Sequence, residues 1–163
     1  TCALPICIDK IDHSKQEFTI EGRILHQSKF TTSTGKASFA VCAVPKLLQA
    51  EDQLRLMTIR SEGQFNTVVY EEEDIYRGQD RRDVVLMNRL DMYKFGVQPD
   101  QKVTIRSDTG IMQNVLVRPF DIRQGNAIMY YPEANVLVPR MVDPESRTPA
   151  FKSVLITMEP VSK

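Results

Sequence analysis

The sequence predicts a mainly β protein whose strands form a compact barrel, with only a few short helices. Residues 102–106 read K-V-T-I-R, which alternates apolar and polar side chains as a half-buried strand does. Residues 83–87 read D-V-V-L-M, a continuous apolar run typical of a strand buried on both faces. Turn residues recur at intervals of roughly 8 to 12 residues, as in a barrel or sandwich. These turns are Pro99-Asp100, Asp108-Thr109-Gly110 and Gln124-Gly125-Asn126.

At least six strands follow from the same patterns. They are expected at residues 54–60, 83–87, 102–106, 114–117, 127–131 and 153–158. Two further strands are expected earlier in the chain, at residues 18–25 and 38–44, joined through the Ser-Thr-rich turn at 33–36. The even spacing of the six later strands favours a single barrel in that part of the chain.

Helical signals are few and short. Asn88 can cap a helix over residues 89–95, with Asp91 near its positive end and Gly96 as a left-handed stop. A second short helix could follow Pro45 over residues 46–53, although its apolar residues cluster at one end.

Composition limits the classes of partner. The 163 residues amount to about one typical domain, and 42% of them are hydrophobic. The 21 basic and 21 acidic residues cancel, so no global field attracts nucleic acid or anionic membranes. Apolar runs are far shorter than the roughly 18 residues of a membrane span. We therefore expect a soluble protein with no nucleic-acid partner and no membrane insertion.

The cysteines and histidines do not form a metal motif. Cys2 and Cys7 are close together near the start, whereas Cys42 lies in an expected strand, where a buried hydrophobic role is the better interpretation. His13 and His26 lack partners at ligand spacing. An odd number of cysteines fits poorly with a disulfide framework, which favours a reducing, cytoplasmic location.

We divide the chain into residues 1–49, a strand-containing lead-in, and residues 50–163, the barrel domain. The chain opens without an initiator Met, so we expect a piece of a longer protein. Residues 139–152 contain few strand signals and are expected to form a loop laid over a surface.

The polar stretch over residues 57–67 has the composition of a ligand loop. It follows a strand, Gly63 permits close backbone approach, and Arg60 offers a planar fork suited to phosphate. Neutral hydrogen-bonding groups come from Ser61, Gln64, Asn66 and Thr67. An ordinary polar turn, with Arg60 paired to a surface carboxylate, explains the stretch about equally well.

Signatures of a self-contained active site are missing. Nucleophile-elbow, Walker and G-x-G-x-x-G motifs do not occur in the sequence. The acidic run at residues 71–74 is better explained as a solvated loop or helix start than as a catalytic carboxylate pair. We therefore assign no catalytic residue and no metal ligand.

An ordered set of motifs identifies a resemblance to a known family. Residues 58–67 match T-x-R-x-x-G-[HQ]-[FWY]-x-T, and Asp91 with Gly96-Val97 precedes a V-x-[IV] strand at 103–105. An aromatic pair, Tyr130-Tyr131, is followed by Asn135 and then by Lys152 of T-P-x-[FY]-K. The set resembles the C-terminal, dinucleotide-binding domain of the molybdopterin oxidoreductases, the dimethyl sulfoxide reductase superfamily. Residues 30–39 are similar to the segment that leads into that domain.

The resemblance implies a double-psi β barrel of the aspartate-decarboxylase-like class, which agrees with the strand pattern. It also implies a bis(molybdopterin guanine dinucleotide) cofactor carrying molybdenum or tungsten in an intact parent enzyme. The cofactor-binding residues implied are Thr58, Arg60, Ser61, Glu62, Gly63, Gln64, Phe65, Asn66, Thr67, Tyr130, Tyr131, Asn135 and Lys152. Either tyrosine could instead lie in the core, because alternate strand residues face opposite sides. Lys152 could be an ordinary solvated lysine.

Within the superfamily, the R-S-x-x-Q-F-N-T variant at 60–67 and the tail at 135–144 resemble formate-dehydrogenase-like large subunits. The metal ligand and any iron-sulfur cluster then lie outside this sequence, so the isolated chain is expected to be inactive. Its partners would be the remaining domains of the parent chain and a redox partner subunit. The alternative is a free-standing double-psi barrel that acts as a protein-interaction adaptor, because this fold hosts unrelated functions. A small pyruvoyl or hydrolytic enzyme ranks last, because its nucleophile signature is missing.

Overall fold

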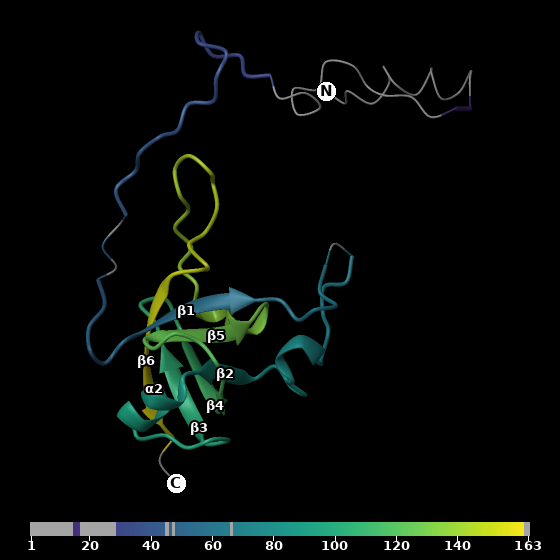
Figure 1. The fold of residues 1–163 in the computed structure, drawn as a ribbon. Coiled ribbons are helices and arrows are strands. Elements are labelled where there is room, and N and C mark those ends of the chain that lie inside the picture. Colours follow the sequence, from purple (N-terminus) through teal and green to yellow (C-terminus); the bar gives the residue numbers. More distant parts are fainter. Residues whose placement is uncertain (1–14, 17–28, 45, 47, 66, 162–163) are drawn as a thin grey trace. The chain divides into compact units, whose positions relative to one another are not determined.

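The computed structural model describes residues 15–16, 29–44, 46, 48–65 and 67–161 (Figure 1). The chain divides into two units, residues 1–46 and 47–163. All regular secondary structure among the described residues belongs to the second unit. The strand expected at residues 18–25 lies outside the described residues.

The second unit is a closed barrel of six strands, which confirms the mainly β class and the double-psi barrel (Figure 1). The strands run in the order β1-β5-β2-β4-β3-β6 around the barrel, and β6 pairs with β1 to close it. β1 and β5 are parallel, as are β2 and β4, and the other pairs are antiparallel. The strands are β1 (Leu54–Ile59), β2 (Val84–Met87), β3 (Lys102–Arg106), β4 (Ile111–Pro119), β5 (Asn126–Tyr130) and β6 (Val154–Pro160).

The topology contains two equivalent halves. Exchanging β1 with β4, β2 with β5 and β3 with β6 reproduces the same ring of neighbours and the same parallel pairs. Because β2 runs antiparallel to β5, the pair β1/β5 and the pair β2/β4 end at opposite ends of the barrel. The fold therefore offers two equivalent places, one at each end, where a pair of parallel strands stops.

Two apolar clusters stabilise the barrel. The larger one alternates along the strands and includes Leu56, Val85, Val103 and Ile156, so these side chains share one face of the closed sheet. The smaller cluster uses the opposite face of β2, β4 and β5: Val84, Leu86, Leu116, Ile128 and Tyr130. Both faces of β2 are buried, as its unbroken apolar run predicts.

Three short helices accompany the barrel. They are the 3-10 helix η2 (Ile75–Arg77), the α-helix α2 (Arg89–Lys94) and the 3-10 helix η3 (Glu133–Leu137). The expected cap of α2 is confirmed, because the Asn88 side chain accepts a hydrogen bond from the Leu90 backbone N–H at 2.8 Å. Gly96 follows with φ 65°, the left-handed geometry that ends the helix.

Two expected elements do not form. Residues 38–44 are exposed and lack strand structure, with Phe39 and Val41 more than nine-tenths exposed, since no described segment pairs with them. The described part of residues 46–53 contains a turn rather than a helix. There the Gln49 amide donates to the carbonyls of Gln53 and Gly125, which ties this segment to the barrel.

The connection after β5 also differs from expectation. Residues 140–150 are all exposed, and Figure 1 shows this yellow-green loop extending from the barrel rather than lying over it. A single bridge between Val142 and Pro149 joins its two arms. β4 begins at Ile111, three residues before its predicted start at 114. Within it, Asn114 has φ 60° and the β3–β4 register shifts nearby, which marks an irregularity in the strand. Sequence alternation does not reveal such an irregularity.

Candidate functional site

The site lies where β1 and β5 end side by side. These parallel strands are in register from Arg55↔Asn126 to Ile59↔Tyr130, so Arg60 and Tyr131 follow at the same edge. The Tyr131 backbone N–H donates to the Ile59 carbonyl at 2.7 Å and extends the pairing by one bond. The segment before β6 returns to this edge, because Thr58 donates from its backbone N–H and its hydroxyl to the Phe151 carbonyl.

A cavity of about 800 Å³ opens at this edge. Its walls come from the end of β1, the connection after it, the residues after β5, and both arms of the loop 139–152. The lining residues are Thr58, Ile59, Arg60, Arg77, Tyr131, Asn135, Val138, Pro139, Arg140, Pro149, Phe151 and Lys152. A cavity of this size accommodates a large organic ligand.

The charged lining of this cavity is entirely cationic. Arg60, Arg77, Arg140 and Lys152 contribute four positive side chains, and no carboxylate is among the lining residues. Arg60 lies over the Tyr131 ring, with its guanidinium carbon 5.8 Å from the ring centroid. The Lys152 ammonium donates to the Thr58 carbonyl. The chain as a whole is neutral, so this concentration of charge is local and suits an anionic group.

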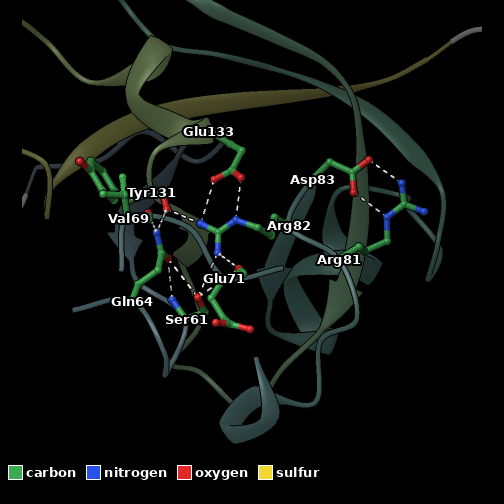
Figure 2. Close-up of polar contacts among 9 residues, drawn as sticks. All are labelled: Ser61, Gln64, Val69, Glu71, Arg81, Arg82, Asp83, Tyr131 and Glu133. Atoms are coloured by element: carbon green, nitrogen blue, oxygen red, sulfur yellow. Dashed lines mark hydrogen bonds and ion pairs between the residues drawn. The ribbon is translucent and has the colours of Figure 1, made fainter. Parts of the chain in front are cut away.

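A buried arginine joins the connection after β1 to the residues after β5 (Figure 2). The Arg82 side chain is 3% exposed and pairs with the Glu133 carboxylate through Nε and Nη2, at 2.6 and 3.0 Å. Nη1 donates to the Ser61 hydroxyl and the Glu71 carbonyl, and Nη2 donates to the Tyr131 carbonyl. These five bonds use the full donor capacity of a guanidinium.

Arg82 also lies close to two aromatic rings. Its guanidinium carbon is 4.8 Å from the centroid of Tyr70 and 5.0 Å from that of Tyr130. The neighbouring Arg81 points away and pairs with Asp83 at the surface, as Figure 2 shows. One arginine is therefore structural, and its neighbour is solvated.

Gln64 fixes the start of the polar loop from inside. Its side-chain oxygen accepts hydrogen bonds from the backbone N–H and the hydroxyl of Ser61, at 3.0 and 3.1 Å. Its amide nitrogen donates to the carbonyls of Val69 and Tyr131, at 2.6 and 3.1 Å (Figure 2). Gln64 and Ser61 are both buried. Their hydrogen bonds are thus made within the protein and hold the loop against β5.

A second polar group lies behind the cavity wall. Asp74 is 1% exposed, and its Oδ2 accepts from the Tyr130 hydroxyl at 2.7 Å and from Arg77 Nη1 at 2.5 Å. Burial opposes ionisation of Asp74, but the hydrogen bonds from Arg77 and Tyr130 outweigh it and lower the pKa of the carboxyl. Burial, and then the bond to Asp74, raises the pKa of the Tyr130 phenol. Both groups therefore keep a fixed charge state at neutral pH.

The structure gathers several of the predicted residues at the cavity. Thr58, Arg60, Tyr131, Asn135 and Lys152 all line it, although they come from three separate parts of the sequence. Arg60 has no carboxylate partner among the described residues, so the alternative of a surface ion pair is not what the structure shows. The two tyrosines have separate positions: Tyr130 lies in the core, and Tyr131 lines the cavity.

The other predicted residues lie elsewhere. Phe65 lines a smaller neighbouring pocket of about 160 Å³ with Arg60, Gln64 and Tyr131. Glu62 and Thr67 line neither cavity. A Cβ on Gly63 would come within 2.8 Å of the Glu71 carboxylate, so this glycine accommodates a protein side chain. Asn66 lies outside the described residues. Direct contact of these residues with a cofactor stays a prediction.

Sequence reasoning missed Arg77, Arg82, Asp74 and Arg140. The acidic run was expected to be a solvated loop or a helix start, and residues 71–73 are exposed while Asp74 directly precedes η2. The Asp74 carboxylate is nevertheless buried and held by Arg77 and Tyr130, which the run itself did not indicate. Arg82 stands two residues before β2, the strand buried on both faces, but the neighbouring Arg81 is exposed, and the sequence does not distinguish the two. The identity of the partner of Arg82, Glu133, has no local signal because it lies 51 residues away.

In the part of the chain that the structure describes, no three His, Cys, Asp or Glu side chains come together as metal ligands. Cys42 is a free, exposed cysteine rather than the buried one expected. Among the described residues no helix has the length and hydrophobicity needed to cross a membrane.

The fold and the site define a class of protein: a double-psi barrel that holds a large, cation-lined cavity where its parallel strands β1 and β5 end. Comparison with known families identifies one family within that class. Residues 54–155, from the start of β1 into β6, match the family described as "Molydopterin dinucleotide binding domain". The chain belongs to this family of molybdopterin dinucleotide-binding domains.

Curated relatives share the sequence over most of this chain. An "Uncharacterized oxidoreductase", Rv2900c of Mycobacterium tuberculosis, is 36% identical over 145 residues, which is 82% of this chain. "Protein YdeP" of Escherichia coli K12 is 28% identical over 148 residues, also 82% of this chain. The chain spans only 19% of the length of either relative.

Among solved structures, the acetylene hydratase from Pelobacter acetylenicus is similar in fold. It aligns with a TM-score of 0.50 at 15% identity, over 66% of this chain and 18% of that chain. At this level of identity the likeness concerns the fold alone.

Proposed function

We propose that this chain is the cofactor-binding domain of a molybdenum or tungsten oxidoreductase. It would hold the pterin and guanine dinucleotide parts of bis(molybdopterin guanine dinucleotide), at the C-terminal end of a formate-dehydrogenase-like parent. The observation that supports this most is the cavity of about 800 Å³ with four cations and no carboxylate in its lining. The relatives named oxidoreductases, which are much longer than this chain, support a larger parent enzyme.

The residues of the cavity fit such a group. A dinucleotide carries a diphosphate, which needs a few local cations rather than a strongly basic protein. Arg60, Lys152 and their cationic neighbours meet that need. Tyr131 offers a ring face, and Thr58 and Asn135 offer neutral polar groups that suit uncharged heterocycle edges. The set of donors therefore matches both the charged and the neutral parts of the cofactor.

Each residue has a defined task in this proposal. Arg60 would donate to phosphate oxygens from its place over Tyr131. Lys152 would contribute a second cation from the arm of the loop 139–152 that leads into β6. The buried bonds of Arg82 and Gln64 would keep the binding loop in one conformation before the ligand arrives. When bound, the cofactor supplies the electron-transfer chemistry, and this domain binds and orients it.

The formate-dehydrogenase-like assignment depends on the R-S-x-x-Q-F-N-T variant. Gln64 stands where relatives of that superfamily often have histidine, and its amide is fully bonded to the protein. An amide does not titrate, so we expect no proton donor at this position. We further propose a cytoplasmic parent whose remaining domains cover this cavity and whose electrons pass to a redox partner subunit.

The test uses the longer enzyme that contains this domain. Arg60→Ala should lower the bound molybdenum or tungsten, measured by inductively coupled plasma mass spectrometry, while the protein stays folded. Arg89→Ala is the matched control, because Arg89 lies at the opposite end of the barrel. Full metal content in Arg60→Ala would contradict the cofactor site. Full metal content in the wild-type enzyme without dye-coupled formate oxidation would contradict only the formate assignment.

A further inference from the structure

We propose that Arg77 is a phosphate ligand of this cavity, held in position by the buried pair Asp74 and Tyr130. This inference deepens the proposed function, since it depends on an anionic ligand in the same cavity. Arg77 lies outside the motifs that carry the family resemblance. It belongs to η2, in the long connection between β1 and β2, and its side chain is 27% exposed on the cavity wall.

Arg77 is held by one nitrogen of its guanidinium. Its Nη1 atom donates to Asp74 Oδ2 at 2.5 Å and to the Arg60 carbonyl at 3.3 Å. Among the described residues, Nε and Nη2 of Arg77 have no hydrogen-bond partner. These two atoms form one edge of the guanidinium, the edge that can bind two oxygens of a phosphate at once. The protein thus fixes one nitrogen and leaves a bidentate edge available.

The residues that support Arg77 are themselves fixed by hydrogen bonds. Asp74 and Gln79 exchange backbone hydrogen bonds at 2.8 and 3.0 Å, which closes the turn around η2. The Tyr130 hydroxyl, from the core of the barrel, fixes the same carboxylate oxygen that binds Arg77. The position of Arg77 is therefore tied to β5 through two side-chain hydrogen bonds.

The two carboxylate oxygens of Asp74 differ in their hydrogen bonds. Asp74 Oδ1 is buried and has no hydrogen-bond partner among the described residues. An unsatisfied buried acceptor is unfavourable, so Oδ1 offsets part of the stability that the hydrogen bonds to Oδ2 contribute. Holding Arg77 at the cavity wall is a role that accounts for keeping a carboxylate in this place.

The four cations of the cavity consequently differ in kind. Arg60, Arg140 and Lys152 form no ion pair among the described residues, whereas Arg77 is oriented by a buried carboxylate. An oriented guanidinium loses less conformational entropy on binding than a mobile one. Arg77 should therefore contribute strongly to affinity for a diphosphate, and its geometry should favour diphosphate over a spherical monoanion.

The experiment measures binding of inorganic pyrophosphate to the 163-residue chain by isothermal titration calorimetry. Arg77→Gln should raise the Kd at least about tenfold, the effect of losing a charge-assisted pair of hydrogen bonds. Arg77→Lys retains the charge but loses the fork, and it should weaken binding as well. Arg81→Gln is the matched control, because Arg81 is a neighbouring arginine that pairs with Asp83 away from the cavity.

The role of Asp74 as a positioning residue needs a double-mutant cycle. As a single variant, Asp74→Asn should weaken pyrophosphate binding. In the Arg77→Gln background the same substitution should add little, because Asp74 acts through Arg77. Equal losses in both backgrounds would contradict that role. If Arg77→Gln fails to fold, the pyrophosphate affinity of Arg77→Lys tests the role of Arg77 instead, since lysine retains a cationic partner for Asp74.

The outcomes separate the two proposals. Wild-type affinity in both Arg77 variants, combined with weaker binding by Arg60→Gln, would overturn the inference and leave the proposed function standing. A wild-type chain that binds no pyrophosphate would overturn both.

Discussion

The two ends of the barrel are equivalent in topology but differ in their connections. At the end where β1 and β5 stop, the chain continues through the long connections 60–83 and 131–153. At the end where β4 and β2 stop, it continues through the shorter connections 120–125 and 88–101. The first pair of connections encloses the cation-lined cavity of about 800 Å³, and the second pair leaves a pocket of about 330 Å³.

This difference separates the contribution of the barrel from that of its loops. The smaller pocket contains Asn88, Arg89 and Asp121, so its charges are mixed, and Asn88 is already used to cap α2. At the larger cavity the two long connections are joined by the Arg82–Glu133 ion pair and by Gln64. Parallel strand ends thus provide the location, and long connections with a buried polar network provide the site.

The largest effect on this comparison should come from breaking the network at the cavity end. Arg82→Met leaves Glu133 without its partner, removes one of the two donors to the Tyr131 carbonyl, and should lower the free energy of unfolding by about 3–5 kcal/mol. Arg81→Met, at an exposed ion pair, should change it by less than about 1 kcal/mol. Urea unfolding of both variants makes the measurement. Equal effects would mean that the long connections fold without Arg82.

The next effect concerns Asp74 and depends on pH. Its folded pKa lies below the ordinary value of 3.8, so it stabilises the protein above about pH 4 and loses this contribution as pH falls through the folded pKa. Asp74→Asn should cost on the order of 1–3 kcal/mol at pH 7, and the difference from wild type should shrink at pH 3. Urea unfolding at both pH values gives the two differences. A difference that does not change with pH would contradict the ionised state of Asp74.

A binding measurement tests whether the two ends differ in function as well as in stability. Arg60→Gln should weaken pyrophosphate binding about tenfold, or about 1.4 kcal/mol, because it removes a cation from the cavity. Arg89→Gln at the equivalent end should leave the Kd unchanged. If calorimetry gave the same loss for both variants, ligand binding would not be confined to the cavity at the β1/β5 end.

The smallest effect is expected at the opposite end. Asn88→Ala removes the cap of α2 and the bond from the Asn88 amide to the Ile122 carbonyl, at a cost of about 1 kcal/mol. Thermal unfolding measures this cost, and pyrophosphate affinity should stay at the wild-type value. A loss of affinity would show that the two ends are coupled through the barrel.

The strands of the barrel were predictable because their signals are local. Alternation identified β3, the continuous apolar run identified β2, and Asn88 with Gly96 bounded α2. The strand expected at residues 38–44 failed because a strand also needs a partner, which a pattern cannot supply.

The site was predictable only in part, for a related reason. The residues after β1 and before β6 could be identified by their motifs, and Arg60, Asn135 and Lys152 do meet at one cavity. The burial of Asp74, Ser61 and Gln64 depends on contacts with Arg82 and β5 that are distant in sequence. Composition marks a polar loop, but it does not tell which polar groups face a ligand and which face the protein.

Closure of the barrel has a consequence for how this domain meets other proteins. Every one of the six strands has a partner on both sides, so none of them offers a free edge to an incoming strand. Recognition by strand addition, a common way to bind an extended peptide, is therefore closed to this barrel. Any neighbouring chain must be recognised through side chains and connections, and replacing those connections can change the neighbour without altering the barrel.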